Sequence, residues 1–313
     1  MAWFSKKSPA EREAQDAAKD ARGAAAVRLA AWDVALSRGG LPDFVQQRLG
    51  DAAARRTPWL ATMTASELLI VRSHGARPIA TICGTCWFQF GASWTRGHAS
   101  GWRTALERLI DEARACGANA VVDVKLRTSA SEGASMDYSL IGTAIRFDSL
   151  PSSPDPVVAT TPALEFVRLL EAGVVPVGIA VGAHYEWMTD NSFGGLSGNV
   201  FSGNQPLTKL GRFWESIRRQ AHAELRRDAA RQGTGVLAHT HFGQLIKQEV
   251  EKQPDRYLGR HIVVGTVVHA KPGEGVPHDI EMVVDMRDGD SSLIRPDAEP
   301  AMAYLNDETE GAI

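Results

Sequence analysis

Two cysteines three residues apart form the pattern in this chain that is most able to bind a metal or act as a redox pair. Cys83 and Cys86 make a Cys-x-x-Cys motif, which can hold zinc or shuttle a disulfide. In a strand, residues three apart point to opposite faces, so one metal could reach both thiolates only if Gly84 introduced a bulge or turn. No second Cys-x-x-Cys and no helix start follow the pair. Core packing of Cys83, a metal site and a redox pair all stay open.

Histidines offer a second possible metal site. His239 and His241 are two residues apart in an expected strand, so they would share one face with about 7 Å between them. His184, in an expected neighbouring strand, would add a third nitrogen ligand, which suits a divalent transition metal such as zinc. The alternative is that these residues face solvent or a subunit contact. The candidate metal ligands are Cys83, Cys86, His184, His239 and His241.

Catalytic patterns do not stand out in the sequence. Glu107, Asp111 and Glu112 lie on the polar side of an expected helix, where charges are usually solvated or paired with arginines. The chain has no Gly-x-Ser-x-Gly, no phosphate-binding glycine loop and no dinucleotide motif. We therefore assign no catalytic or cofactor-binding residue. The sequence favours a non-enzymatic role and leaves an enzyme open, because a fold does not fix a function.

The composition narrows the class of protein. A chain of 313 residues with 44% hydrophobic residues has room for two domains. Its net charge of −3 gives no basic footprint, so we expect no nucleic-acid partner. Three cysteines are too few for a secreted disulfide framework and indicate a reducing cytoplasm. The chain lacks the run of about 18 apolar residues that a membrane span needs.

The elements that must position these residues form an α+β pattern. We predict an N-terminal helical segment (1–60), a first domain (62–147), a proline-rich linker (148–160), a second domain (161–286) with an inserted loop (191–207), and a flexible tail (287–313). Each domain should contain a three-stranded sheet and one long packed helix. One helix covers only one face of such a sheet, so the other face needs cover from a neighbour or from another subunit.

An internal repeat relates the two domains. Residues 67–87 align without gaps to residues 165–185 at an offset of 98, and the four identities recur at that spacing: Glu67, Gly75, Pro78 and Gly84 match Glu165, Gly173, Pro176 and Gly182. The long helices align at an offset of 116, with Gly117 as a left-handed helix cap in the first copy. We also align the strand beginning at Ala120 with the one beginning at Val236, and Thr143 with Thr266.

Residues in the first copy resemble a known bacterial family. Gly-Ala-Asn-Ala-Val-Val at 117–122, the helix before it and Ile-Gly-Thr-Ala-Ile at 141–145 are similar to the YbjQ-like, heavy-metal-binding family. The segment from Glu67 to Gly84 resembles its longer tandem members. The resemblance covers 62–147 well and 161–270 more weakly, since Gly233-Thr-Gly-Val-Leu-Ala replaces the diagnostic run in the second copy.

The resemblance implies small α+β domains that assemble into pentameric rings and have no established reaction. We therefore expect a homo-oligomeric, ring-forming protein that binds an unidentified protein partner, with two stacked rings as the simplest arrangement. The alternative is a protein that binds or senses heavy metal through the histidine and cysteine ligands named above.

Overall fold

The structure is a computed structural model that describes residues 9–89, 93–131, 135–189, 208–248 and 256–270. All of these residues belong to one compact unit, Met1–Pro272. The helices are α1 (Pro9–Ser37), α2 (Asp43–Ala53), α3 (Ala65–Ser73), α4 (Trp94–Ala115), α5 (Ala163–Glu171) and α6 (Thr208–Ala229). The strands are β1 (Ala76–Gln89), β2 (Ala120–Ser131), β3 (Ser135–Phe147), β4 (Val157–Val158), β5 (Val175–Thr189), β6 (Gly235–Gln248) and β7 (Arg256–His269).

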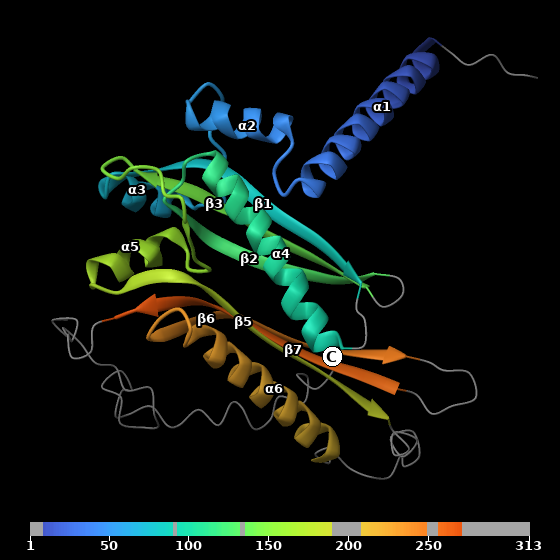
Figure 1. The fold of residues 1–313 in the computed structure, drawn as a ribbon, viewed down its shortest axis with the longest axis vertical. Coiled ribbons are helices and arrows are strands. Elements are labelled where there is room, and N and C mark those ends of the chain that lie inside the picture. Colours follow the sequence, from blue (N-terminus) through green and yellow to red (C-terminus); the bar gives the residue numbers. More distant parts are fainter. Residues whose placement is uncertain (1–8, 90–92, 132–134, 190–207, 249–255, 271–313) are drawn as a thin grey trace, which may run out of the picture. The chain divides into compact units, whose positions relative to one another are not determined.

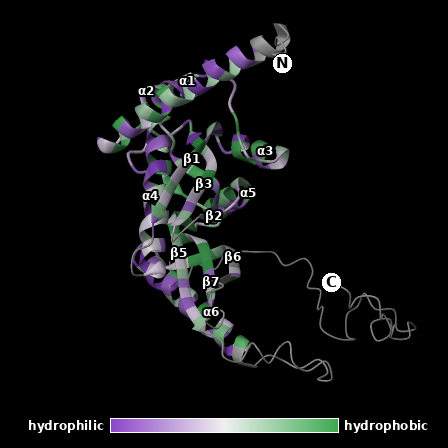
Figure 2. Ribbon diagram, turned by 90° about the vertical axis from the view of Figure 1, so that its right-hand side faces the viewer, coloured by the Kyte–Doolittle hydropathy of each residue, from purple (hydrophilic) through white to green (hydrophobic). Residues whose placement is uncertain are grey.

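Two sheets repeat the same plan, which confirms the predicted fold class (Figure 1). The first has the order β1-β3-β2-β4 and the second the order β5-β7-β6, and the long strands pair antiparallel. α4 packs on the first sheet and α6 on the second. Figure 2 shows hydrophobic residues interspersed with paler and hydrophilic ones along the strands, and much of α1 in hydrophilic colours. None of the described helices has the length and apolar character needed to cross a membrane.

The repeated glycines have physical reasons that the structure makes visible. A Cβ on Gly84 would lie 2.0 Å from the Ala105 carbonyl oxygen of α4, and one on Gly182 would lie 2.1 Å from the Ala221 carbonyl oxygen of α6. The bare backbone at these positions therefore lets each helix lie directly on its strand. Gly75 and Gly173 have φ values of +71° and +72°, the left-handed region where glycine avoids a Cβ clash. Gly117 has φ +67° and ends α4 as predicted.

The two domains bury their sheets against each other. On the second sheet, the face opposite α6 carries Val181 and Tyr185, which are buried in one hydrophobic cluster with residues of α4. On the first sheet, Val122 is buried with Phe166 and Val167 of α5. α4 therefore covers the second face of the second sheet, whereas α5 covers the second face of the first sheet around Val122 and leaves Trp87 exposed.

The linker is more than a spacer. Val157 and Val158 form β4, which adds to β2 as a parallel strand and gives the first sheet a fourth strand that we did not predict. The Val157 N–H donates to the Asn119 carbonyl at 3.0 Å, and the Ala159 N–H donates to the Val121 carbonyl at 2.8 Å. The domain boundaries stay predictions, and the inserted loop 191–207 and the tail 287–313 lie outside the described residues.

The strand alignment of the repeat needs a correction of one residue. β7 pairs Gly235 with Val268, whereas β3 pairs Ala120 with Ile145. Since Ile145 and Val268 are equivalent at an offset of 123, Ala120 corresponds to Gly235, an offset of 115 instead of 116. The shift arises because one residue lies between Gly233 and β6, whereas two lie between the equivalent Gly117 and β2. His239 therefore takes the register position of Val124, where we had aligned it with Asp123.

Candidate functional site

The two cysteines of the Cys-x-x-Cys motif lie on opposite faces of β1. Cys86 is buried beneath α4, while Cys83 is exposed, so core packing, one of the three alternatives that the sequence leaves open for Cys83, is wrong. Protein atoms around the Cys83 thiol and the nearby Glu112 carboxylate raise the pKa of this thiol. Burial raises the pKa of the Cys86 thiol as well. Neither cysteine is poised as the thiolate that metal binding or disulfide exchange uses.

The histidines of the predicted triad are distributed over non-adjacent strands. His184 lies on β5 and the other two on β6, and β7 runs between these strands. The β6 ladder has a register irregularity between Ala238 and Thr240, which falls at His239. The side chains of His239 and His241 lie outside what the structure describes. The expected direct neighbourhood of His184 with β6 is therefore wrong, because the third strand intervenes.

The structure instead pairs His184 with His261, which in turn lies beside His222, and we did not single out either of these two histidines. His184 pairs with His261 across β5 and β7, which places their Cβ atoms about 5 Å apart on one face. The ring of His222, from α6, has its centroid 5.8 Å from that of His261. In the described part of the chain, no three or more His, Cys, Asp or Glu side chains form a group that could hold a metal ion. The signal that could have found His261 was the repeat, which sets it opposite His184.

A buried polar cluster joins the two domains. His98 of α4 places its Nδ1 2.9 Å from the Tyr185 hydroxyl and 3.1 Å from the Tyr138 hydroxyl. Complete burial and the nearby Arg260 guanidinium lower the pKa of His98 to about 3. Its Nε2 has no hydrogen-bond partner among the described residues. His98 is therefore a neutral imidazole that connects α4 to both sheets.

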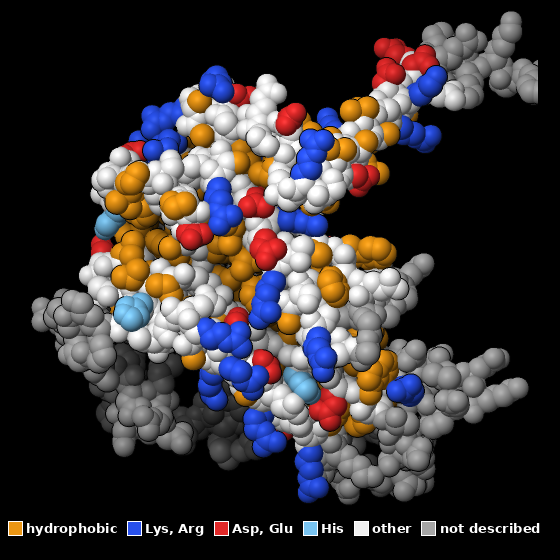
Figure 3. All heavy atoms as spheres, viewed as in Figure 1, with side chains coloured by type: hydrophobic (Ala, Val, Ile, Leu, Met, Phe, Trp, Pro, Cys, Tyr) orange, Lys and Arg blue, Asp and Glu red, His pale blue; other side chains and the backbone are white. Residues whose placement is uncertain are grey.

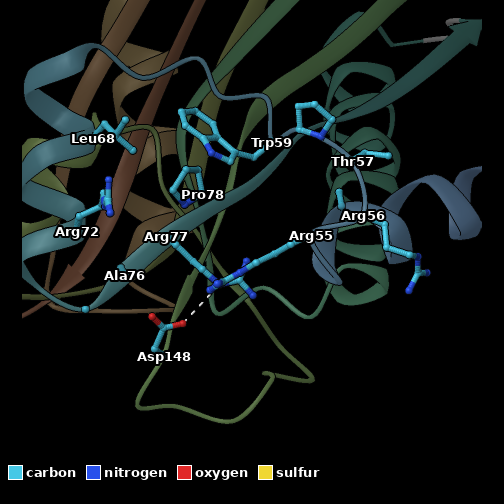
Figure 4. Close-up of a pocket in the computed structure, with 13 residues that line it drawn as sticks. Arg55, Arg56, Thr57, Trp59, Leu68, Arg72, Ala76, Arg77, Pro78 and Asp148 are labelled. Carbon is cyan, nitrogen blue, oxygen red and sulfur yellow. Dashed lines mark ion pairs between the residues drawn. The ribbon is translucent and has the colours of Figure 1, made fainter.

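An arginine-lined cleft opens in the first domain where β1 begins (Figure 4). Arg55, Arg72 and Arg77 line it together with Trp59, and its volume is about 730 Å³. Arg77 forms an ion pair with Asp148 at 3.4 Å, and Figure 4 shows Arg55 pointing toward Arg77. Cations outnumber the single lining carboxylate, so the electrostatics of the cleft favour anions.

Two hydrogen-bond systems recur in both copies. The Thr143 hydroxyl accepts from the Thr62 N–H at 2.9 Å, and the Thr266 hydroxyl accepts from the Thr160 N–H at 2.8 Å. Glu112 accepts from the Cys83 N–H at the outer edge of β1, while Asp228 accepts from the Val181 N–H at the edge of β5. Each long helix thus supplies a carboxylate that satisfies an otherwise open strand edge.

Comparison with known proteins gives one match. Residues 91–148 match a family model, YbjQ_1, described as "Putative heavy-metal-binding". The match confirms the family resemblance for the first copy and does not extend to the second. No curated protein and no solved structure matches the chain.

Proposed function

We propose that this chain, whose residues 91–148 match the YbjQ-like family, is a non-enzymatic protein that assembles with copies of itself into a ring and binds a partner through the assembled surface. The support comes from a comparison of the two repeats. Surfaces that the second domain buries against the first are exposed in the first domain itself. A surface that is apolar in both repeats and covered in only one indicates a missing neighbour.

Three pairs of equivalent residues carry the proposal. Leu60 is 69% exposed, whereas Val158 is 4% exposed; Leu69 is 69% exposed, whereas Val167 is 1% exposed; Trp87 is 66% exposed, whereas Tyr185 is 7% exposed. Each pair is related by the offset of 98. Figure 3 shows hydrophobic side chains gathered at the surface around α3 and α5. Burying side chains of this size contributes roughly 1.5–3 kcal/mol each, which is enough to drive association when several act together.

The mass of the native protein tests the proposal. Native mass spectrometry of the full chain at micromolar concentration should give an integral multiple of the 33.8 kDa protomer, and the family resemblance implies five copies. A monomer at this concentration would overturn the proposal.

A second function, transition-metal binding, is supported by two pairwise contacts of His261, with His184 across the strands and with His222 of α6. The three imidazoles would have to rotate toward a common point, and His239 and His241 are further ligands on the same domain. Imidazole ligands suit zinc, copper or nickel. This grouping agrees with the description of the matching family.

Metal analysis of protein purified without a histidine tag tests this second function. We expect stoichiometric metal that is lost in His222→Ala/His261→Ala, while His74→Ala, at the residue that follows α3, retains it. If the untagged protein carries no metal after incubation with zinc, copper or nickel, the second function is wrong.

A further inference from the structure

We infer that copies of this chain join head to tail: residues 59–63 of one copy add as a parallel strand to the outer edge of β6 in the next copy. The inference rests on the proposed self-assembly and specifies the surface that carries it. It follows from a contact that already exists inside the chain, between β4 and β2. The contact has two sides, the added strand β4 and the sheet edge β2. Because the domains are repeats, each side has an equivalent, which is residues 59–63 for β4 and β6 for β2. Within one chain, β4 and β2 pair with each other, whereas the two equivalents do not.

The joined contact defines the geometry. β4 pairs with β2 in the register Ala120–Val157 and Val121–Val158. Past the β4 residues, the Asp123 N–H donates to the Thr161 carbonyl at 2.8 Å and the Val124 N–H donates to the Ala159 carbonyl at 3.0 Å. Two successive N–H groups of β2 thus point outward, as a β-bulge allows. Asp123 has φ +55° at this point.

The sheet edge to which the added strand pairs, β2 in the first domain, has its equivalent in β6. β6 is an edge strand, and its register irregularity between Ala238 and Thr240 lies where β2 has its own. At the offset of 115, Leu237 corresponds to Val122. Leu237 is 37% exposed, whereas Val122 is fully buried under α5. No described residue pairs with this outer edge, so β6 presents a strand template and an apolar side chain without cover.

The added strand, β4, has its equivalent in residues 59–63, which precede α3. At the offset of 98, Trp59 and Leu60 correspond to the β4 residues Val157 and Val158. Trp59 and Leu60 are both exposed. The segment is already held in place, because the Thr62 N–H donates to Thr143 just as the Thr160 N–H donates to Thr266. A pre-positioned strand loses little conformational entropy when it pairs, which favours addition to a sheet edge.

A repeated glutamate completes the match. Glu67 accepts a hydrogen bond from the Ala163 N–H, at the first residue of α5, with a distance of 3.2 Å. Glu165 is the equivalent of Glu67, and Ala65, at the first residue of α3, is the equivalent of Ala163. In the head-to-tail contact, Glu165 of the copy that supplies β6 therefore accepts from the Ala65 N–H of the copy that supplies residues 59–63. This explains why the glutamate recurs in both repeats.

The occupant of the β6 edge is a second copy of this chain, since the contact requires the particular strand, helix and spacing that residues 59–69 provide. The two surfaces differ, so the contact is heterologous, and repetition of it gives a ring when the rotation between copies closes. First and second domains then alternate around a single ring, in contrast to the two stacked rings that the family resemblance suggested.

Directional disulfide cross-linking tests the inference. Transferring the observed register by the two offsets pairs Trp59 with Gly235 and Leu60 with Val236. Facing residues in paired strands lie within the Cα separation of 4.4–6.8 Å that a disulfide needs. We would make Leu60→Cys and Val236→Cys as separate chains, each with Cys83→Ser, because Cys83 is the exposed native cysteine. Non-reducing gel electrophoresis after mild oxidation is the readout.

The expected result is a cross-linked dimer when the two variants, whose remaining native cysteines Cys86 and Cys116 are buried, are mixed, and none when either is oxidised alone. Ile246→Cys, near the other end of β6, is the matched control and should not cross-link to Leu60→Cys. Cross-linking of Leu60→Cys to itself would show an isologous contact and overturn the inference, as would equal cross-linking in the control.

A third outcome separates this inference from the proposed function. If native mass spectrometry shows an oligomer but the mixed chains do not cross-link, the chain assembles through another surface, and only the inference is wrong. If the chain is monomeric, both are wrong. Circular dichroism of each variant confirms folding, and Leu237→Asp offers a second route to the same result: it should dissociate the oligomer by placing a charge in the contact.

Discussion

Glu67, in the first domain, accepts a hydrogen bond from the backbone N–H of Ala163, at the start of the second domain's leading helix. The same carboxylate accepts from the Thr64 N–H at 2.6 Å and completes a capping box at the start of α3. One side chain thus accepts hydrogen bonds at the N-terminal ends of two helices that belong to different domains. A residue that the sequence shows only as a repeated glutamate therefore belongs to the domain contact.

Substitution of an exposed leucine should separate the copies. Leu69→Lys places a charge at the position whose repeat equivalent, Val167, is buried. Loss of an apolar contact of this size weakens association by roughly 10- to 100-fold, from about 1.5–3 kcal/mol. Sedimentation velocity over a dilution series measures the shift. Leu150→Lys, at another exposed leucine, is the control and should leave the mass unchanged; equal effects of both variants would contradict the prediction.

Glycine at the helix–strand crossings should be irreplaceable. Gly182→Ala forces a Cβ to within 2.1 Å of the Ala221 carbonyl oxygen, so α6 must move, at a cost of about 1–3 kcal/mol in the free energy of unfolding. Urea unfolding monitored by circular dichroism measures the loss. Gly50→Ala, in α2 with open space around it, should instead stabilise the protein by roughly 0.5–1 kcal/mol. Unchanged stability in Gly182→Ala would show that the close packing is absent.

The hydrogen bonds to Thr266 should contribute more to the free energy of unfolding than the equivalent bond to Thr143. Thr266→Val leaves the buried Thr160 N–H without its acceptor, and the Thr161 N–H, 3.2 Å from the same hydroxyl, loses its acceptor too. Each unsatisfied buried group costs roughly 1–3 kcal/mol. Thr143→Val removes the equivalent acceptor for Thr62, which is exposed and can bond to water. Denaturant titration at a concentration where the copies are separate should therefore show the larger loss in Thr266→Val, and the reverse order would contradict the burial argument.

Acid should destabilise the domain contact through His98. Burial and Arg260 lower the pKa of folded His98 to about 3, below the usual value of about 6.5 in an unfolded chain. Between these values the unfolded chain binds the proton and the folded chain does not. The stability contributed by neutral His98 is thus complete above about pH 6.5 and declines as the pH falls, by about 1.4 kcal/mol per pH unit.

Thermal unfolding between pH 4 and 7 measures this decline. His98→Gln keeps a polar side chain but cannot titrate in this range, so its stability should depend less steeply on pH than that of the unsubstituted protein. Parallel pH profiles of the two proteins would show that His98 does not carry the effect.

Local sequence patterns were enough to predict much of the fold. The recurrence of Gly84 as Gly182 predicts the same helix crossing in both domains because only a bare backbone tolerates the close approach. The left-handed turn at Gly117 was predictable for a similar reason. β4 was not, because a proline-rich segment carries no strand signal and Val157 and Val158 pair only through the neighbouring domain's edge.

The candidate sites were less predictable, since they depend on pairing between distant segments. The alternation rule correctly placed Cys83 and Cys86 on opposite faces, but the sequence could not show that Cys83 is exposed. The association of His184 with His261 depends on which strands are adjacent in the sheet, and the sheet order β5-β7-β6 places the last strand in the middle. That order became predictable only from the repeat as a whole.

The strand pairing of β4 with β2 also sets how the protein responds to dilution. Because a single chain holds both partners, this contact forms at an effective concentration in the millimolar range that is independent of the amount of protein. The proposed contact between copies lacks that advantage. On dilution, an assembled ring should therefore dissociate at the contacts between chains, while the contact between the two domains of each chain stays formed. The dissociation product is then the intact two-domain protomer.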